Sequence, residues 1–374
     1  MRLPKGRPVV VHDFFVSEGG ADHCAIEFAR LLPTATVATS FFDARRFGDR
    51  IDPGRVHTWP LQRLLGPTRH FRAFLPLYPI WFERMDLHAA PFVLSSSIAF
   101  THAVRTASSA LHVSYVYTPM RYAWDLETYI EGSSLSLAAR LAARTIRPIL
   151  RRWDVATASR PNVVVAISET VRERIARHWG RTTDAVIYPP VDTGQLRATE
   201  PDDGYLLVAA RLLAYRRVDL AVQAATRLGR KLIIVGDGPE RSRLEAMAGP
   251  SVRFLGHVDR PTLVNLFERC HAYLVPGVED FGIAPVEAMA AGRPVVAFRD
   301  GGTRETVVDG VTGTFFDVQS VAAVIEAIER LDHRQLDRHV IRARAEEFDR
   351  TVFRHRWREL LGRLGVDRSM LAVE

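Results

Sequence analysis

The sequence lacks the marks of several protein classes. Only two cysteines occur, Cys24 and Cys270, and they lie far apart, so we expect no disulfide framework and a reducing, cytosolic setting. No run of 18 apolar residues is present, which argues against a membrane-spanning helix. The apolar run Val9–Val11 is short and is soon followed by Asp13, so we expect no secretory signal.

Signals for metals and redox cofactors are also missing. No Asp-x-Asp triplet occurs, and the 13 histidines show no metal-ligand spacing. The turn 236–240 (GDGPE) follows an apolar run but is not the six-residue dinucleotide fingerprint, so we interpret it as structural. We therefore expect neither a bound metal nor a nicotinamide cofactor.

Lysine is scarce as well, since Lys5 and Lys231 are the only two among 50 basic residues. The formal net charge is +7, and the basic excess lies wholly in residues 1–190, with 24 basic and 16 acidic residues. That half should face something anionic: phospholipid, a polyprenyl pyrophosphate or nucleic acid. Arginines recur at helical spacing from Arg140 to Arg152, which fits either a solvated helix face or a membrane-surface patch.

Buried apolar runs alternate with helix patterns along both halves of the chain. Residues 8–12, 92–95, 112–117 and 162–166 predict strands in the first half, and Ser168 predicts a helix start. The pattern restarts after the connection Ile187–Asp192, which contains two prolines, with strands at 205–210, 232–235, 252–255, 272–275 and 294–298. This alternation indicates an α/β protein with two doubly wound parallel sheets.

The strongest functional signal is the segment 279–287, EDFGIAPVE. Glu279 follows a predicted strand, Glu287 lies in a predicted helix, and Gly282 lets the backbone approach a ligand. The free N–H groups of that helix start favour an anion or hydroxyl oxygens, and a carboxylate is a natural acceptor for the two ribose hydroxyls. By spacing alone, a solvated surface glutamate with a capping glutamate fits equally well.

The segment resembles the Glu–seven residues–Glu motif of retaining GT-B glycosyltransferases, the large family that includes bacterial mannosyl- and glucosyltransferases. Residues 17–22 (SEGGAD) resemble the Gly-Gly-Ala-Glu loop of the family's N-terminal domain, with Asp22 in place of Glu. Residues 210–219 (ARLLAYRRVD) resemble its donor-phosphate segment, with Arg216 in place of Lys. The resemblance covers nearly the whole chain. It implies the GT-B fold: two Rossmann-like domains, residues 1–190 and 191–350, facing a central cleft, with residues 351–374 packing back on the first.

The resemblance also implies the donor site. Glu287 would bind the ribose, Glu279 would lie near the donor sugar, and Arg211 and Arg216 would hold the diphosphate in place of a metal. Arginine forks suit this role, because negative charge grows on the leaving diphosphate. The backbone that lines the sugar and diphosphate would come from Gly19, Gly20, Phe281, Gly282, Ile283 and Ala284.

An acceptor side is expected in residues 115–125 (YVYTPMRYAWD), which follow an apolar strand. Tyr122 and Trp124 offer flat rings for sugar stacking, and Arg121 and Asp125 can fix hydroxyls or a phosphate; the alternative is that the two aromatic rings belong to the core. In the family a His usually precedes the Thr-Pro pair and contacts the transferred sugar, whereas here Tyr117 holds that place. A phenol is neutral at pH 7, so we expect it to act through hydrogen bonds and not as a titrating base.

The sequence therefore predicts a retaining glycosyltransferase. The Thr-Pro-Met-Arg-Tyr segment resembles GDP-mannose-dependent O-antigen mannosyltransferases, which implies transfer of mannose from GDP-mannose to a glycan or lipid-linked glycan. We expect a cytoplasmic protein in peripheral contact with anionic lipid at the inner face of the plasma membrane, and no nucleic-acid partner. Two alternatives remain: a GT-B scaffold that has lost activity, and a nucleotide-sugar epimerase or phosphorylase on the same fold.

Overall fold

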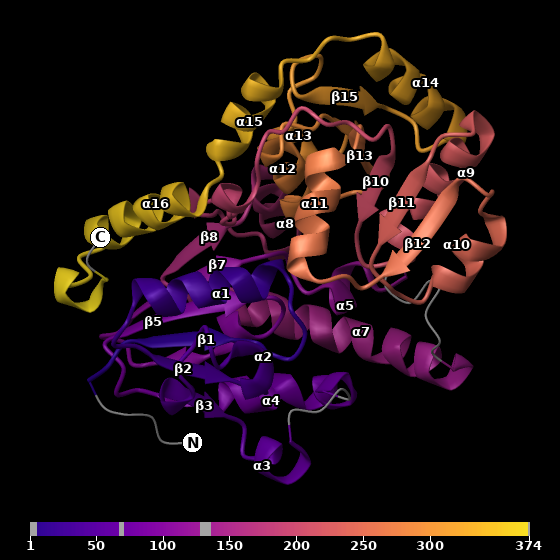
Figure 1. Ribbon diagram of the computed structural model, residues 1–374. Coiled ribbons are helices and arrows are strands. Elements are labelled where there is room, and N and C mark those ends of the chain that lie inside the picture. Colours follow the sequence, from indigo (N-terminus) through magenta and orange to yellow (C-terminus); the bar gives the residue numbers. More distant parts are fainter. Residues whose placement is uncertain (1–5, 67–70, 128–135, 373–374) are drawn as a thin grey trace. The chain divides into compact units, whose positions relative to one another are not determined.

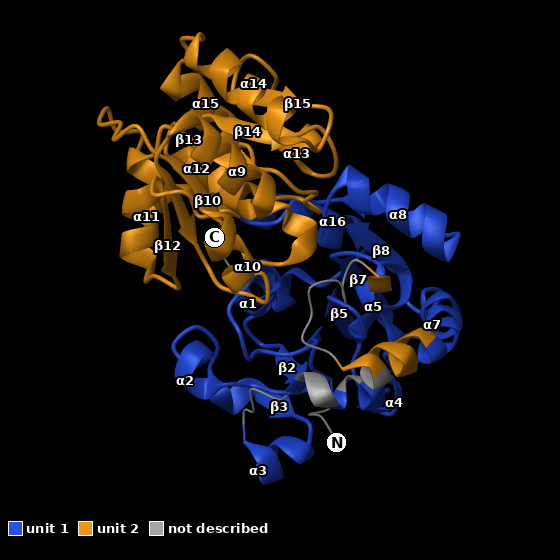
Figure 2. Ribbon diagram, turned by 90° about the vertical axis from the view of Figure 1, so that its right-hand side faces the viewer, with its two compact units in different colours: residues 1–125, 145–190, 353–374 blue, residues 126–144, 191–352 orange. Residues whose placement is uncertain are grey.

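The computed structural model describes residues 6–66, 71–127 and 136–372, and the chain folds into two compact units. Unit 1 comprises residues 1–125, 145–190 and 353–374, and unit 2 comprises residues 126–144 and 191–352 (Figure 2). Each unit contains a parallel sheet with helices packed along it, and most of the elements are labelled in Figure 1. No helix in the described ranges is long and apolar enough to cross a membrane.

Unit 1 is built on a parallel sheet with the strand order β3-β2-β1-β5-β7-β8-β9. Its strands are β1 (Val9–His12), β2 (Thr36–Thr39), β3 (Val56–Thr58), β5 (Phe92–Ser97), β7 (Leu111–Val116), β8 (Val163–Ala166) and β9 (Ala185–Val186), and a separate short pair joins β4 (Asp86–Leu87) to β6 (Arg105–Thr106). Its helices are α1 (Gly20–Leu31), α2 (Ala44–Phe47), α3 (Leu61–Leu65), α4 (Tyr78–Glu83), α5 (Arg121–Trp124), most of α7 (Leu137–Thr157), α8 (Glu169–Trp179) and most of α16 (Arg350–Arg363).

Apolar side chains on both faces of this sheet explain why its strands read as unbroken apolar runs. All four residues of β1 and of β8 are buried, as parallel strands covered on both faces require. On one face, α16 inserts the fully buried Trp357, whose ring packs edge-on against Phe28 of α1 and Tyr115 of β7. Helix α16 therefore completes the core of a unit whose sheet comes from residues 9–186.

Unit 2 repeats the architecture with the strand order β12-β11-β10-β13-β14-β15. Its strands are β10 (Leu206–Ala209), β11 (Leu232–Val235), β12 (Val252–Gly256), β13 (Ala272–Val275), β14 (Val295–Phe298) and β15 (Gly313–Phe316). Its helices are α9 (Val218–Leu228), α10 (Arg241–Met247), α11 (Arg260–Arg269), α12 (Ile283–Ala290), α13 (Thr303–Thr306), α14 (Val321–Asp332) and α15 (Arg338–Glu346). Side chains of α9 and α14 form one apolar core with β10, β11 and β13.

The chain passes between the units four times, and the two segments of unit 2 that adjoin the crossings after residues 190 and 352 are hydrogen-bonded to each other. Val191 and Asp349 form a parallel bridge, in which the Val191 N–H donates to Phe348 O and the Arg350 N–H donates to Val191 O, both at 3.0 Å. The Asp349 carboxylate also accepts from the Thr193 hydroxyl at 2.6 Å. These two segments are therefore held side by side within unit 2.

The predicted α/β class with two doubly wound parallel sheets is confirmed. Ser168 caps α8 as expected, because its hydroxyl accepts from the Val171 N–H at 3.1 Å. The sequence interpretation missed the short strands β2, β3, β9 and β15 and the helices α14 and α15.

Candidate functional site

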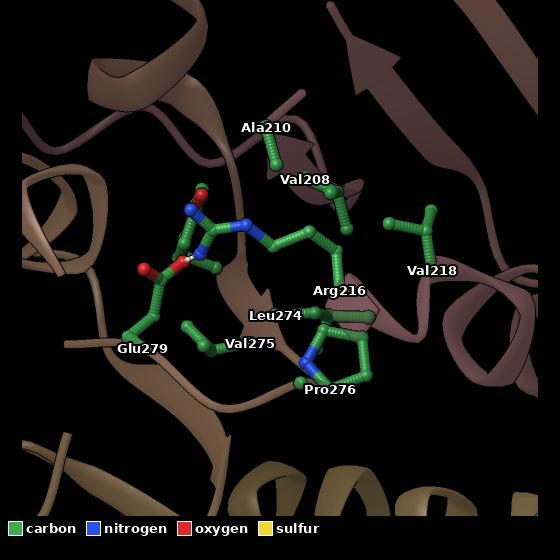
Figure 3. Close-up of a pocket in the computed structure, with 10 residues that line it drawn as sticks. Val208, Ala210, Arg216, Val218, Leu274, Val275, Pro276 and Glu279 are labelled. Atoms are coloured by element: carbon green, nitrogen blue, oxygen red, sulfur yellow. Dashed lines mark ion pairs between the residues drawn. The ribbon is translucent and has the colours of Figure 1, made fainter. Parts of the chain in front are cut away.

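The sheet of unit 2 changes direction between β10 and β13, because β11 and β12 lie to one side of β10 while β13, β14 and β15 lie to the other. Ligands of doubly wound sheets bind beyond the carboxyl ends of the strands at such a point. A small pocket lies there (Figure 3). Its lining comes from the two strands and the segments that follow them: Val208, Ala210, Arg216, Val218, Tyr273, Leu274, Val275, Pro276, Gly277 and Glu279. Its enclosed volume is about 10 Å³, room for roughly one water molecule.

Arg216 and Glu279 meet in this pocket and form an ion pair (Figure 3). Arg216 ends the 3-10 turn Ala214–Arg216 after β10, and Glu279 belongs to the loop after β13. A Cβ at Gly277 would lie 2.4 Å from Tyr215 O and 2.7 Å from Arg216 Cα, so only glycine allows the two loops to come this close. Among the described residues, the buried Arg216 Nε has no hydrogen-bond partner.

Arg211 lies on the same loop but is exposed, and no carboxylate of the described chain pairs with it. The turn Gly236–Gly238 supports its backbone from below: the Leu212 N–H donates to Asp237 O at 3.0 Å, and the Glu240 N–H donates to Leu212 O at 3.2 Å. The structural role expected for this turn therefore consists in holding the loop that carries Arg211 and Arg216.

Glu287 lies on α12, at 13% exposure of its side chain, and forms an ion pair of 2.6 Å with Arg260 Nη1 at the start of α11. A ribose bound here would donate its hydroxyls to the Glu287 carboxylate either beside Arg260 or in place of it. Gly282 precedes α12 with a φ of +96°, a conformation that glycine adopts without strain. The Phe281 ring turns into the core and packs edge-on against Phe348, so the loop presents its backbone, together with the half-buried Ile283 and Ala284.

The sheet of unit 1 changes direction between β1 and β5, and buried polar side chains gather at the carboxyl ends of these strands. The Asp13 carboxylate accepts from the Ile98 and Phe100 N–H groups at 2.7 and 2.8 Å and so holds the loop after β5. Burial raises the pKa of Asp13 to about 6, an effect that His12 and these N–H groups oppose. His12 contacts Ser96 on one side and Asp22 of α1 on the other.

Tyr117 directly follows β7 and belongs to the same polar group. Its side chain is nearly enclosed, and its hydroxyl donates to Ala21 O at 3.0 Å and lies 2.8 Å from Ser96 Oγ. Burial raises the pKa of the phenol well above its ordinary value, so the group is neutral at physiological pH. The structure thus directs this hydroxyl toward the first turn of α1, next to Gly19 and Gly20.

The predicted acceptor segment, residues 115–125, contains the end of β7 and the short helix α5, both within unit 1. Arg121 Nη1 and Asp125 Oδ2 approach to 3.9 Å. The Trp124 indole donates to Asp154 Oδ2 at 2.7 Å and stacks on His178 with 4.4 Å between ring centroids, while Tyr122 packs on the core. A sugar could stack on the His178-covered face of Trp124 only by displacing the His178 ring. The contacts of Tyr122 and Trp124 resemble those of core residues more than those of an open stacking surface.

Of the five arginines of α7, Arg147 and Arg151 contact the backbone of unit 1, whereas Arg144 and Arg152 are exposed. Arg147 and Arg151 donate to Ala123 O at 3.1 and 2.8 Å, and Arg144 pairs with Glu127. Five apolar side chains of α7 are exposed as well, Ile149 by 66%: Leu137, Leu141, Ile146, Ile149 and Val155.

The sequence interpretation missed several residues that shape these sites. Gly277 and Arg260 belong to no motif that was recognised, and Ser96 stands in a run of three serines with no signal of its own. Asp22 belongs to the SEGGAD segment, but nothing in that segment indicates its contact with His12. Among the described residues, no group of three or more His, Cys, Asp or Glu side chains is arranged to bind a metal.

Comparison with known proteins finds related sequences and a similar fold. Residues 196–348 match the family described as "Glycosyl transferases group 1". A "GDP-mannose-dependent alpha-mannosyltransferase" of Mycolicibacterium smegmatis is 29% identical over 54% of this chain and 55% of its own length. A "D-inositol 3-phosphate glycosyltransferase" of Mycobacterium leprae is 32% identical over 45% of each chain. The chain therefore spans about half the length of these relatives.

A solved structure shares the fold along nearly the whole chain. Anabaena Alr3699/HepE, crystallised in complex with UDP and glucose, superposes with a TM-score of 0.68 and 19% identity over 95% of this chain and 99% of its own.

Proposed function

Because this chain has the GT-B fold and its residues 196–348 form a glycosyl transferases group 1 domain, we propose that it is a retaining glycosyltransferase. Its donor is GDP-mannose, and its acceptor is a glycan or a lipid-linked glycan. The observation that supports this most is the Arg216–Glu279 pair at the strand switch point of unit 2, with a buried guanidinium N–H that lacks a partner among the described residues. The diphosphate of a nucleotide sugar supplies the oxygen that this donor needs.

The proposed chemistry uses the protein's cations in place of a metal. As the bond between the sugar C1 and the phosphate oxygen breaks, Arg211 and Arg216 stabilise the charge that grows on the diphosphate. The acceptor oxygen bonds to C1 on the face that the leaving group vacates, and its proton passes to the departing phosphate oxygen. Glu287 holds the ribose, and Glu279 contacts the sugar hydroxyls once the diphosphate takes over Arg216.

The proposal is tested first on donor binding, by calorimetry with GDP and UDP. We expect GDP to bind the wild type, and Glu287→Ala to weaken GDP about ten- to a hundred-fold, because hydrogen bonds to a charged group contribute about 1.5–3 kcal/mol. Glu326→Ala, on the exposed face of α14, is the matched control and should leave the affinity unchanged. Equal affinities for all three proteins would contradict the ribose assignment.

Turnover then separates the rival functions. We expect mannose transfer from GDP-mannose with retention, giving an α-linkage. A UDP-sugar that is used while GDP-mannose is not would overturn the donor and leave the fold assignment intact. Isomerised donor without any acceptor would favour an epimerase, and no donor consumption above background would favour an inactive scaffold.

We also infer that this protein is cytoplasmic and contacts the anionic inner face of the plasma membrane. The excess of basic residues in residues 1–190 and the exposed apolar face of α7, beside the exposed Arg144 and Arg152, support this. We expect the protein to co-sediment with anionic liposomes at low salt and not with neutral ones.

The variant Leu141→Glu/Ile149→Glu should abolish this co-sedimentation, because it places charge on the apolar face. Val340→Glu, which changes a valine on α15 that is 45% exposed, is the control and should bind as the wild type does. Sedimentation that ignores lipid charge and salt would speak against the contact.

A further inference from the structure

Four buried side chains of unit 1 form one continuous chain of polar contacts. Asp22 Oδ1 lies 3.4 Å from His12 Nε2, and His12 Nδ1 lies 3.0 Å from Ser96 Oγ and 3.2 Å from Ser96 O. Ser96 Oγ lies 2.8 Å from the Tyr117 hydroxyl, which donates to Ala21 O at 3.0 Å. Each of the four residues is at most 8% exposed, so water does not compete for these contacts.

The number of available protons fixes the direction of the chain. Ala21 O can only accept, so the one proton of Tyr117 goes there, and the Ser96 hydroxyl must donate to the Tyr117 oxygen. Ser96 then accepts from a proton on His12 Nδ1. The reverse direction would bring the Tyr117 and Ala21 oxygens to 3.0 Å without a proton between them.

One more proton is needed between His12 Nε2 and Asp22 Oδ1, because Nδ1 already carries its own. The pair is therefore an imidazolium with a carboxylate, or an imidazole with a carboxylic acid, and its net charge is zero in both forms. A neutral pair suits a site that is almost completely buried, where an unbalanced charge is costly.

This series of polar contacts connects the ends of three strands to the start of one helix. His12 ends β1, Ser96 lies near the end of β5, and Tyr117 follows β7. Both far ends of the chain lie on the first turn of α1: the Asp22 side chain at one, the Ala21 carbonyl at the other. Gly19 has no side chain to cap this helix, and the Asp22 carboxylate accepts from the Gly19 backbone N–H instead, so the same carboxylate contacts both His12 and the start of the helix.

We propose that Ser96 is a positioning residue for sugar transfer: by joining His12 to Tyr117 it fixes the first turn of α1, and with it the Gly19-Gly20 backbone, to which the resemblance of residues 17–22 assigns a donor-site role. This inference rests on the proposed function for its catalytic consequence alone. Ser96 touches no substrate and acts through the two contacts that hold α1. Ser95, the adjacent residue, is equally buried but bonds to His112 Nε2 at 2.9 Å and has no place in the chain.

The experiment compares Ser96→Ala with Ser95→Ala, two substitutions in β5 that each remove one hydroxyl group. For Ser96→Ala we expect kcat to fall about ten-fold, the factor that one hydrogen bond of ordinary strength contributes, while GDP affinity stays within about two-fold. Amide hydrogen exchange of residues 20–24 should accelerate. For Ser95→Ala we expect both kcat and this exchange to match the wild type.

Coupling through Ser96 is tested by a double-mutant cycle. His12→Gln and Tyr117→Phe remove contacts that do not touch each other, yet we expect their effects on kcat to be non-additive, and additive when Ser96→Ala is also present. Equal behaviour of the two serine variants, or an additive first cycle, would overturn the proposal. A wild type that transfers no sugar would refute the proposed function instead, and hydrogen exchange would still decide whether Ser96 fixes α1.

Discussion

Replacing Arg216 with alanine is expected to lower kcat by about 10²–10³-fold, the loss seen when one preorganised donor to a developing negative charge is removed. The guanidinium lies at the strand switch point of unit 2, paired with Glu279, and its Nε still has no partner within the described chain. GDP affinity should fall less than kcat does, because the negative charge is largest in the transition state. Steady-state kinetics with saturating donor, together with calorimetry, separate the two effects.

Two further variants sharpen this test. Arg216→Lys restores the residue that is usual at this place in the family, and it should recover kcat to within about ten-fold of the wild type, since a point charge still reaches the diphosphate. Arg227→Ala removes an exposed arginine from α9 and should have no effect. If Arg216→Ala weakened GDP binding and kept kcat at saturation, the residue would be a ground-state binder only.

Replacing Trp357 with alanine is expected to cost unit 1 about 3–5 kcal/mol, the range for large buried aromatic side chains. The ring is fully buried, with centroid distances of 4.8 Å to Phe28 and 5.4 Å to Tyr115. For a unit of this size, the loss corresponds to a melting temperature lowered by about 10 °C. Differential scanning calorimetry, with and without GDP to stabilise unit 2 selectively, assigns the shifted transition.

Trp357→Phe provides the matched comparison. The indole N–H is buried without a hydrogen-bond partner among the described residues, so phenylalanine keeps most of the ring contacts and removes an unsatisfied donor. We expect it to recover more than half of the loss. A melting temperature unchanged in Trp357→Ala would mean that α16 does not contribute to the core of unit 1.

Local chemistry made much of the fold predictable. Apolar runs such as Val163–Ala166 are typical of strands in a parallel sheet that is covered on both faces. Ser168 marks a helix start because its hydroxyl accepts from the backbone N–H three residues later. The strands β2 and β3 are not apparent in the sequence because threonine and histidine interrupt their apolar pattern, and they become strands only by pairing, β2 with β1 and β3 with β2. Contacts of that kind lie outside any short window of sequence.

The sites divide in the same way. The motif residues Arg216 and Glu279 could be named from the sequence, but their ion pair depends on Gly277, whose importance appears only once two distant loops meet. The spacing of the α7 arginines places them on one side of a helix but does not show what that side contacts. In the structure, Ala123 O accepts hydrogen bonds from two of them, Arg147 and Arg151. Ser96 is invisible for the same reason, since its partners come from β1 and from the loop after β7.

The contact of Trp357 with Phe28 also bears on how this chain is made. A ribosome releases residues 1–190 long before residue 353, by roughly 10–30 s at the usual rates of synthesis. During that interval Phe28 and Tyr115, which α16 covers in the finished protein, have no partner from the last helix, so the first sheet waits with an apolar face open. Unit 2, by contrast, is almost continuous in sequence, and all but residues 126–144 can fold as it emerges. A nascent chain stalled before α16 should therefore hold a folded second unit behind an incomplete first one, and it should be the form that chaperones bind.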